Sequence, residues 1–120
     1  MINFIKSLFS SPKYIVYKSD KNNNYYFNLL AKNGEIILTS EGYLNKDGVM
    51  TGVSSVSLHG KDMFNFEIRD SKDGKYYFAL KARNNKIIGT SEIYNSKSSA
   101  SDGIESVISC CGTNVIKFDE

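Results

Sequence analysis

The sequence contains few of the residue types that define the chemically specialised classes of protein. Its 120 residues include no Trp, one Pro, one His and two Cys. These counts exclude a zinc cluster built on Cys and His, a disulfide scaffold and a proline-rich adaptor. No run of about 18 apolar residues is present, so no segment reads as a membrane-spanning helix. What remains is a chain with 41% hydrophobic and 23% charged residues, the composition of one globular domain of ordinary size.

The charge balance is nearly even. Fifteen Lys and Arg stand against thirteen Asp and Glu, which leaves a formal charge of +2. Strong binders of nucleic acid or anionic membranes carry a larger cationic excess, so the net charge favours neither partner.

The N-terminus and the cysteines predict a cytoplasmic protein. Residues 1–12 form a short amphipathic segment, in which Asn3 and Lys6 interrupt the continuous apolar run that a signal peptide needs. Cys110 and Cys111 are adjacent and lack the Cys-x-x-Cys spacing, which favours two reduced thiols over a disulfide. A redox switch at this pair is the alternative, and their redox state is left open.

An internal repeat organises the chain. A shift of 51 residues aligns 15–56 with 66–107 without a gap, and seventeen of the 42 pairs are identical. We therefore predict a duplication, with repeat one at 13–58, a linker at 59–65, and repeat two with a C-terminal tail at 66–120. Because the linker is short and has no Pro or Ser tract, we expect one compact domain.

Each repeat shows the same order of local patterns, three strands and then a helix. Aromatic and β-branched residues predict the strands, and Asp, Asn and Gly predict the turns between them. The predicted strands are Ile15–Lys18, Tyr25–Lys32 and Glu35–Ser40 in repeat one, and Phe66–Arg69, Tyr76–Arg83 and Lys86–Ser91 in repeat two. Apolar residues at helical spacing begin after Lys46 and Lys97, with Asn45 and Ser96 placed as N-caps.

The alternation along the second strands predicts the core. Phe27 and Leu29 share one face, and Phe78 and Leu80 repeat it. A three-stranded sheet with one helix is too small to be stable alone. We therefore predict an α+β fold in which two tandem β-β-β-α repeats form one pseudo-two-fold symmetric body, with antiparallel sheet or sheets packed on two helices. The linker permits one continuous sheet or two facing sheets, and this choice is left open.

The repeated motifs resemble those of a known family. Repeat one carries Ala31-Lys-Asn-Gly-Glu-Ile-Ile37 and Ser40-Glu-Gly-Tyr43, and repeat two carries Ser91-Glu-Ile-Tyr94-Asn-Ser-Lys97 and Gly103-Ile-Glu-Ser-Val107. This combination is similar to the YegP-like (UPF0339) family of small bacterial and archaeal proteins, and the resemblance spans about 15–118. It implies an α+β fold with paired repeats in one chain, and it implies no activity.

The most chemically suggestive motif is a Ser-Glu-x-Tyr sequence that occurs once in each repeat. Its residues are Ser40, Glu41 and Tyr43 in repeat one and Ser91, Glu92 and Tyr94 in repeat two. A carboxylate beside a phenol could transfer protons if burial tuned the pKa of the Glu. The motif falls, however, at the corner between strand and helix, where such side chains satisfy backbone N–H groups. We favour a structural role, and we predict no enzyme, no cofactor and no metal site.

The outward sides of the two predicted sheets differ, and this difference is the main indication of function. The candidate nucleic-acid face of repeat two is Arg69, Tyr77, Lys81 and Arg83, and the candidate partner face of repeat one is Val16, Tyr26 and Leu30. An exposed apolar face favours a protein partner or a second copy of the chain. We therefore predict a protein-interaction or self-association module, with the choice between monomer and dimer left open. The alternative is weak binding of single-stranded nucleic acid through phosphate contacts and base stacking.

Overall fold

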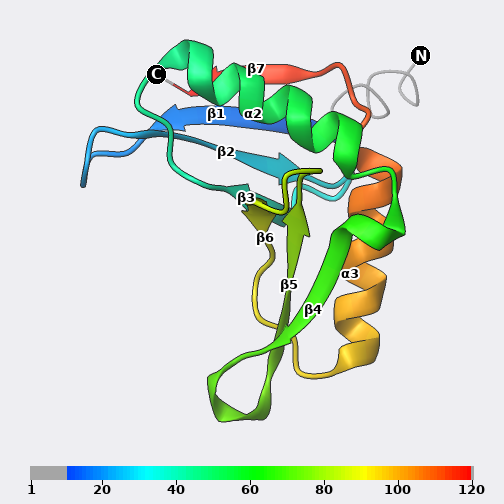
Figure 1. Ribbon diagram of the computed structural model, residues 1–120. Coiled ribbons are helices and arrows are strands. Elements are labelled where there is room, and N and C mark those ends of the chain that lie inside the picture. Colours follow the sequence, from blue (N-terminus) through cyan, green and yellow to red (C-terminus); the bar gives the residue numbers. More distant parts are fainter. Residues whose placement is uncertain (1–10, 120) are drawn as a thin grey trace.

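The computed structural model describes residues 11–119, so the predicted N-terminal segment lies, up to residue 10, outside the described residues. Repeat one holds β1 (Lys13–Lys18), β2 (Tyr25–Leu30), β3 (Ile36–Ser40) and α2 (Lys46–His59). Repeat two holds β4 (Phe66–Asp70), β5 (Tyr76–Lys81), β6 (Ile87–Thr90) and α3 (Lys97–Cys110), followed by β7 (Ile116–Asp119). Short 3₁₀ turns occupy Met63–Asn65 and Lys72–Gly74. The predicted order of three strands and a helix is confirmed in both repeats (Figure 1).

Both helices begin at their predicted caps. The side-chain oxygen of Asn45 accepts a hydrogen bond from the backbone N–H of Gly48 at 2.8 Å. The hydroxyl of Ser96 accepts one from the N–H of Ser99 at 3.0 Å. Each cap satisfies one of the N–H groups that the first helical turn leaves without an intrahelical partner.

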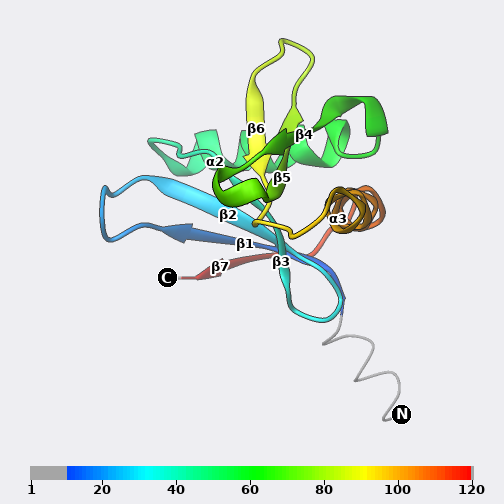
Figure 2. The same cartoon turned by 90° about the horizontal axis from the view of Figure 1, so that it is seen from below.

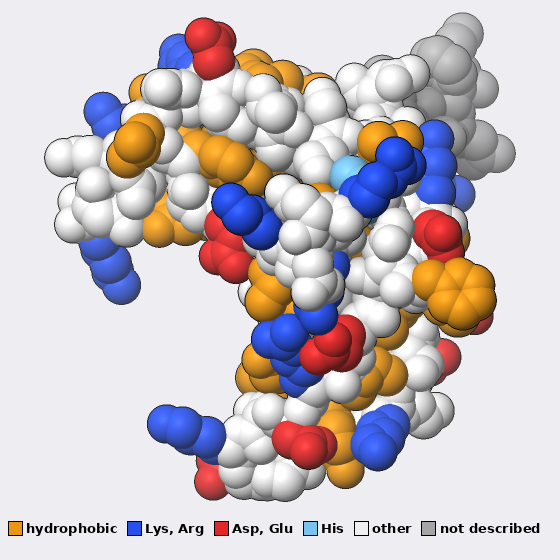
Figure 3. Space-filling model, in the orientation of Figure 1, with side chains coloured by type: hydrophobic (Ala, Val, Ile, Leu, Met, Phe, Trp, Pro, Cys, Tyr) orange, Lys and Arg blue, Asp and Glu red, His pale blue; other side chains and the backbone are white. Residues whose placement is uncertain are grey.

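The strands form one continuous seven-stranded sheet in the order β4-β5-β6-β3-β2-β1-β7, which decides between the two arrangements that the linker permits. At its centre β3 of repeat one pairs with β6 of repeat two, through Thr39 with Thr90 and Ser40 with Gly89. This junction is short, and the strands of the two repeats run in clearly different directions on either side of it (Figures 1 and 2). The molecule is hollowed on one side between the two halves (Figure 3).

The C-terminal tail contains a strand that the sequence analysis did not predict. β7 pairs in parallel with β1, with Tyr14 beside Ile116 and Tyr17 beside Asp119. The last residues of the chain therefore extend the sheet at the edge of repeat one. Among residues 11–119 no helix is long and apolar enough to cross a bilayer.

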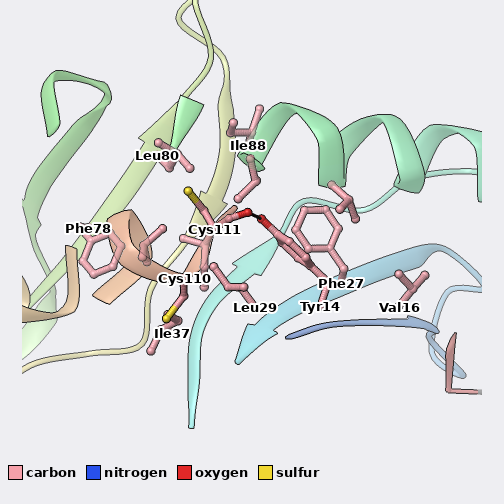
Figure 4. Close-up of a cluster of buried hydrophobic side chains, with 14 of the residues drawn as sticks. Tyr14, Val16, Phe27, Leu29, Ile37, Phe78, Leu80, Ile88, Cys110 and Cys111 are labelled. Atoms are coloured by element: carbon pink, nitrogen blue, oxygen red, sulfur yellow. Dashed lines mark hydrogen bonds between the residues drawn. The ribbon is translucent and has the colours of Figure 1, made fainter. Parts of the chain in front are cut away.

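The core lies between one face of the sheet and both helices. α2 contacts β2, β5 and β6, while α3 contacts β2, β3, β4 and β5, so each helix packs across both repeats. The largest fully buried side chains among the described residues are Tyr14, Phe27, Phe78, Leu29, Leu38, Leu80, Val16, Val49, Val56, Val107 and Cys111. In the close-up of Figure 4 the hydroxyl of Tyr14 donates to the backbone oxygen of Cys111 at 2.6 Å, which ties β1 to the end of α3.

Candidate functional site

One face of the sheet, opposite the core, carries no helix among the described residues, and we call it the open face (Figure 2). The strand registers place one residue of every strand in a single row across it. From edge to edge this row is Lys117, Ile15, Asn28, Thr39, Thr90, Ala79 and Glu67. Because side chains alternate between the two sides of a strand, residues two positions away lie on the same face.

The prediction that Val16 belongs to an outward face is wrong. Val16 is 1% exposed and pairs with Phe27 in the core. The turn between β1 and β2 spans 19–24, whereas the turn between β4 and β5 spans 71–75 and is one residue shorter. The gapless shift of 51 residues therefore fails in the first strand, and a slip of one residue exchanges the two faces of a strand. Ile15 and Tyr17 occupy the open face instead.

The repeat-one half of the open face presents a group of aromatic and apolar side chains. We define the repeat-one face as Ile15, Tyr17, Tyr26 and Leu30, each of them half-buried. Tyr17 stacks on Tyr26, with 5.8 Å between ring centroids and 19° between ring planes. The side-chain amide of Asn22 donates to the hydroxyl of Tyr26 at 2.9 Å. Burial, with a contribution from Tyr26, raises the pKa of Tyr17 above its ordinary value. Tyr17 therefore presents a neutral hydroxyl, and both rings are held in one orientation.

The repeat-two half of the open face carries alternating charge. Glu67 lies between two cations, with 2.8 Å to the Nε of Arg69 and 2.8 Å to the Nζ of Lys81. Hydrogen bonds from Lys81 and Arg69 hold the pKa of Glu67 below its usual value. Hydrogen bonds to Glu67 and to Tyr77 raise the pKa of Arg69. The structure thus places Arg69, Tyr77 and Lys81 close together, with the carboxylate of Glu67 among them.

Arg83 lies beyond the end of its strand, because β5 ends at Lys81. The backbone N–H of Arg83 donates to the Nε2 of His59 at 3.3 Å, and His59 is the last residue of α2. Together with Lys81 and Phe64, Arg83 lines a shallow hollow at the start of β4. It therefore neighbours Lys81 without sharing the regular strand positions of the open face.

The serines of the Ser-Glu-x-Tyr motif hydrogen bond to the backbone of the second strand of each repeat, β2 or β5. The N–H of Phe27 donates to the hydroxyl oxygen of Ser40 at 2.9 Å, and that hydroxyl donates to the carbonyl of Glu41 at 2.8 Å. Repeat two repeats the arrangement, with Phe78 donating to Ser91 at 2.9 Å. Each serine thus satisfies a backbone N–H of β2 or β5 where the pairing with the next strand ends.

The tyrosines of the motif lie against glycines of the helices. A Cβ atom on Gly52 would stand 2.8 Å from Cε2 of Tyr43, and one on Gly103 would stand 2.8 Å from Cζ of Tyr94. Only glycine permits so close an approach, which gives these two glycines a packing role. Burial is the main cause that raises the pKa of both phenols above the ordinary value, so neither is suited to proton transfer near neutral pH.

The described residues provide little for catalysis beside this motif. An open hollow of about 440 Å³ adjoins it in repeat one, and its lining includes Glu41 and Tyr43, but Glu41 is exposed. Burial raises the pKa of the Cys111 thiol, which opposes formation of the nucleophilic thiolate. Across residues 11–119 no group of three His, Cys, Asp or Glu is placed to hold a metal ion.

The sequence analysis missed a second hollow of about 440 Å³ at the end of β1. Its lining includes Lys18 and Tyr25 from the first hairpin, Lys46 at the start of α2 and Phe118 of β7. The Nζ of Lys18 lies 5.7 Å from the centroid of the Tyr25 ring, and the Nζ of Lys46 lies 6.0 Å from that of Phe118. The pairing of β7 with β1 brings Phe118 here, and the available signal was the short run of Val115, Ile116 and Phe118 in the tail.

Comparison with known proteins matches both repeats to one family. A family model described as a domain of unknown function, DUF1508, matches residues 20–63 and 71–117. A UPF0339 protein of Photorhabdus laumondii is 50% identical over 91 residues, which cover 76% of this chain and 80% of that protein. The UPF0339 protein YegP of Yersinia pestis is 42% identical over 100 residues, or 83% of this chain and 89% of YegP.

Solved structures show the same fold. The solution NMR structure of yegP from E. coli, a protein of unknown function, is similar with a TM-score of 0.84 at 36% identity, over 91% of this chain and 93% of that one. The solution NMR structure of a UPF0339 protein from Shewanella oneidensis is similar with a TM-score of 0.82 at 42% identity, over 90% of this chain and 91% of that one.

Proposed function

This chain belongs to the UPF0339 family, whose domain is described as one of unknown function, and from its geometry we propose that it is a non-catalytic protein-interaction module. The repeat-one face is its binding surface. The observation that carries this proposal is the stacked pair Tyr17 and Tyr26, with Ile15 and Leu30 farther along the same face of the sheet, which carries no helix among residues 11–119.

The chemistry of this face matches that of protein interfaces. Tyrosine is enriched at such interfaces because its ring is apolar while its hydroxyl can bond to water or to a partner. The stack and the hydrogen bond from Asn22 already orient the rings of Tyr17 and Tyr26. Little side-chain freedom is therefore lost on binding, which favours affinity.

Site-specific photo-crosslinking in cells tests the proposal. A photoreactive residue replaces Asn28, which lies on the open face beside the repeat-one face, and in a control it replaces the exposed Glu105 on α3. We expect a defined adduct from position 28 that position 105 does not give. Identical adducts from both positions would contradict the proposal.

The purified partner then allows a quantitative test. The double variant Tyr17→Ser/Leu30→Ser should raise its dissociation constant by at least about tenfold, because truncated aromatic and aliphatic anchors each cost about 1 kcal/mol or more. Tyr77→Ser on the repeat-two half is the matched control and should leave binding unchanged. Equal affinity of the double variant and the wild type would refute the assignment of this face.

A second candidate function is weak binding of single-stranded nucleic acid, and one observation favours it. Arg69, Tyr77 and Lys81 lie together on the open face, where cations and a ring could contact phosphate and base. Glu67 opposes this use, and in Figure 3 basic and acidic side chains are interspersed. We expect anisotropy of a labelled mixed oligonucleotide to rise only at low salt, about 50 mM, and more strongly for Glu67→Gln. No change in anisotropy for either protein would remove this candidate.

A further inference from the structure

β4 lies at one edge of the sheet, and within residues 11–119 its only strand neighbour is β5. The corresponding strand of repeat one, β1, has β2 on one side and β7 on the other. The fold thus shows that the outer side of this first strand accepts another strand. In repeat two no strand among the described residues pairs with that side.

The backbone of β4 points alternate hydrogen-bonding groups away from the sheet. The N–H of Ser71 donates to the carbonyl of Lys75 at 2.7 Å, so the odd-numbered residues of β4 pair inward with β5. The backbone groups of Phe66, Ile68 and Asp70 therefore point outward. The N–H of Phe66 is satisfied by the carbonyl of Met63. In β1 the equivalent outward group, the N–H of Tyr14, donates to the carbonyl of Val115, the residue before β7, at 2.9 Å.

The side chains of β4 are complementary to a second copy of the same strand. Its sequence is Phe-Glu-Ile-Arg-Asp. When two such strands pair antiparallel about Ile68, Ile68 faces its own copy, and Glu67 of each strand faces Arg69 of the other. In this register Ile68 and its copy form a hydrogen-bonded pair, in which the N–H of each donates to the carbonyl of the other. The two charged pairs then occupy the non-hydrogen-bonded sites, where side chains approach most closely.

We propose that β4 is a homotypic docking edge, through which two copies of this chain join their sheets by antiparallel β4–β4 pairing centred on Ile68. This inference is independent of the proposed function, which uses the repeat-one face rather than the sheet edge. The partner is a second copy because antiparallel pairing of β4 with itself about Ile68 places Glu67 of each strand opposite Arg69 of the other. Pairing centred on Glu67 or on Arg69 would instead place like charges opposite one another.

The ion pairs within one copy are compatible with this pairing. Arg69 contacts Glu67 of its own chain through Nε at 2.8 Å, and the other guanidinium N–H groups can reach the Glu67 of the second copy. Phe64 is 96% exposed and lies two residues before β4, where it can pack beside the added strand. Because β4 has only five residues, the interface is smaller than that of a stable dimer, and the association is weak and dependent on concentration.

Charge exchange within β4 tests the proposal by sedimentation at concentrations from about 10 μM to about 1 mM. We expect the average mass of the wild type to rise from 13.5 kDa toward twice that value. Glu67→Arg and Arg69→Glu each place like charges opposite one another and should abolish the rise. The double variant Glu67→Arg/Arg69→Glu restores opposite charges and should restore it.

The remaining outcomes decide against the proposal. A wild type that stays at 13.5 kDa throughout the range would overturn it, as would association that neither single variant weakens. Tyr17→Ser/Leu30→Ser is the control and should leave the association intact. If this control alone abolished association, the dimer would lie on the repeat-one face, and the β4 edge would be excluded while the proposed function stood. Near-identical melting temperatures of the β4 variants exclude loss of folding as the cause.

Discussion

Gly52→Ala should destabilise this protein although glycine is a poor helix former. In the interior of a helix such as α2, a change from Gly to Ala ordinarily stabilises by about 1 kcal/mol. Here the added Cβ would meet the ring of Tyr43, with Cε2 at 2.8 Å and the hydroxyl closer still. Forcing a methyl group into a filled site costs about 1–3 kcal/mol.

The rigidity of the neighbour decides where the net effect falls. Several atoms of one ring crowd the new methyl, and the backbone of Tyr43 is bonded to Tyr25 in both directions, at 2.7 and 2.8 Å. We therefore expect the steric cost to lie near 3 kcal/mol, about the top of its range. After the gain in helix propensity, the free energy of unfolding should fall by about 2 kcal/mol and the melting temperature by about 6–10 °C. Urea denaturation followed by circular dichroism measures the free energy of unfolding.

Two further variants make the result diagnostic. Gly48→Ala lies in the first turn of the same helix, where the nearest atom to the new Cβ is the capping oxygen of Asn45 at 3.3 Å, so it should cost far less than Gly52→Ala. In a Tyr43→Ala background the cost of Gly52→Ala should vanish, giving a coupling of at least about 1 kcal/mol. If Gly52→Ala destabilised the protein no more than Gly48→Ala does, the packing of Tyr43 on α2 would be refuted.

Three other changes have defined outcomes. Tyr14→Phe removes the buried hydrogen bond to Cys111 and should lower the free energy of unfolding by about 1–3 kcal/mol, measured by urea denaturation; an unchanged value would contradict that bond. Ser40→Ala leaves the N–H of Phe27 without its acceptor and should cost about as much, with faster amide hydrogen exchange at that N–H as the local readout. The pKa of Glu67 is lowered by its cationic neighbours, so its stabilising effect is present above its unfolded pKa, near 4.5, and is lost as pH falls through its folded pKa. The stability difference between the wild type and Glu67→Gln should therefore shrink below about pH 4.5, and a difference that grew on acidification would reverse this sign.

The repeats and the core were predictable because both depend on local pattern. The alternation at Phe27 and Leu29 places these side chains in the core, and the duplicated Phe78 and Leu80 follow, all of them fully buried. The caps and the start of each helix were readable for the same reason, since Asn45 bonds only three residues along the chain.

The errors arose where one residue or a distant pairing decides the outcome. The turn after β1 has one residue more than the turn after β4, so β1 is shifted by one residue relative to β4. Val16 therefore faces the core, although the rest of the two repeats aligns without a gap. β7 pairs with β1, a strand about one hundred residues earlier in the chain. The four residues of β7, Ile116–Asp119, form too short a pattern to predict such a distant contact. Glu67 pairs with Arg69 of its own strand, and only its second ion pair, to Lys81, depends on β4 and β5 being neighbours in this register.

The placement of β7 explains why the duplication cannot be fully symmetric. The chain that leaves α3 crosses to the first strand of the other repeat and pairs with it as the edge strand β7. In sequence, the segment that follows α2 corresponds to the segment that follows α3. It has only residues 60–65 before β4 begins. A segment that leads directly into a strand cannot also pair in parallel along that same strand. When two repeats are joined in one chain, the segment after the second helix can therefore pair with the other repeat as β7, whereas the segment after the first helix serves as the connector to β4.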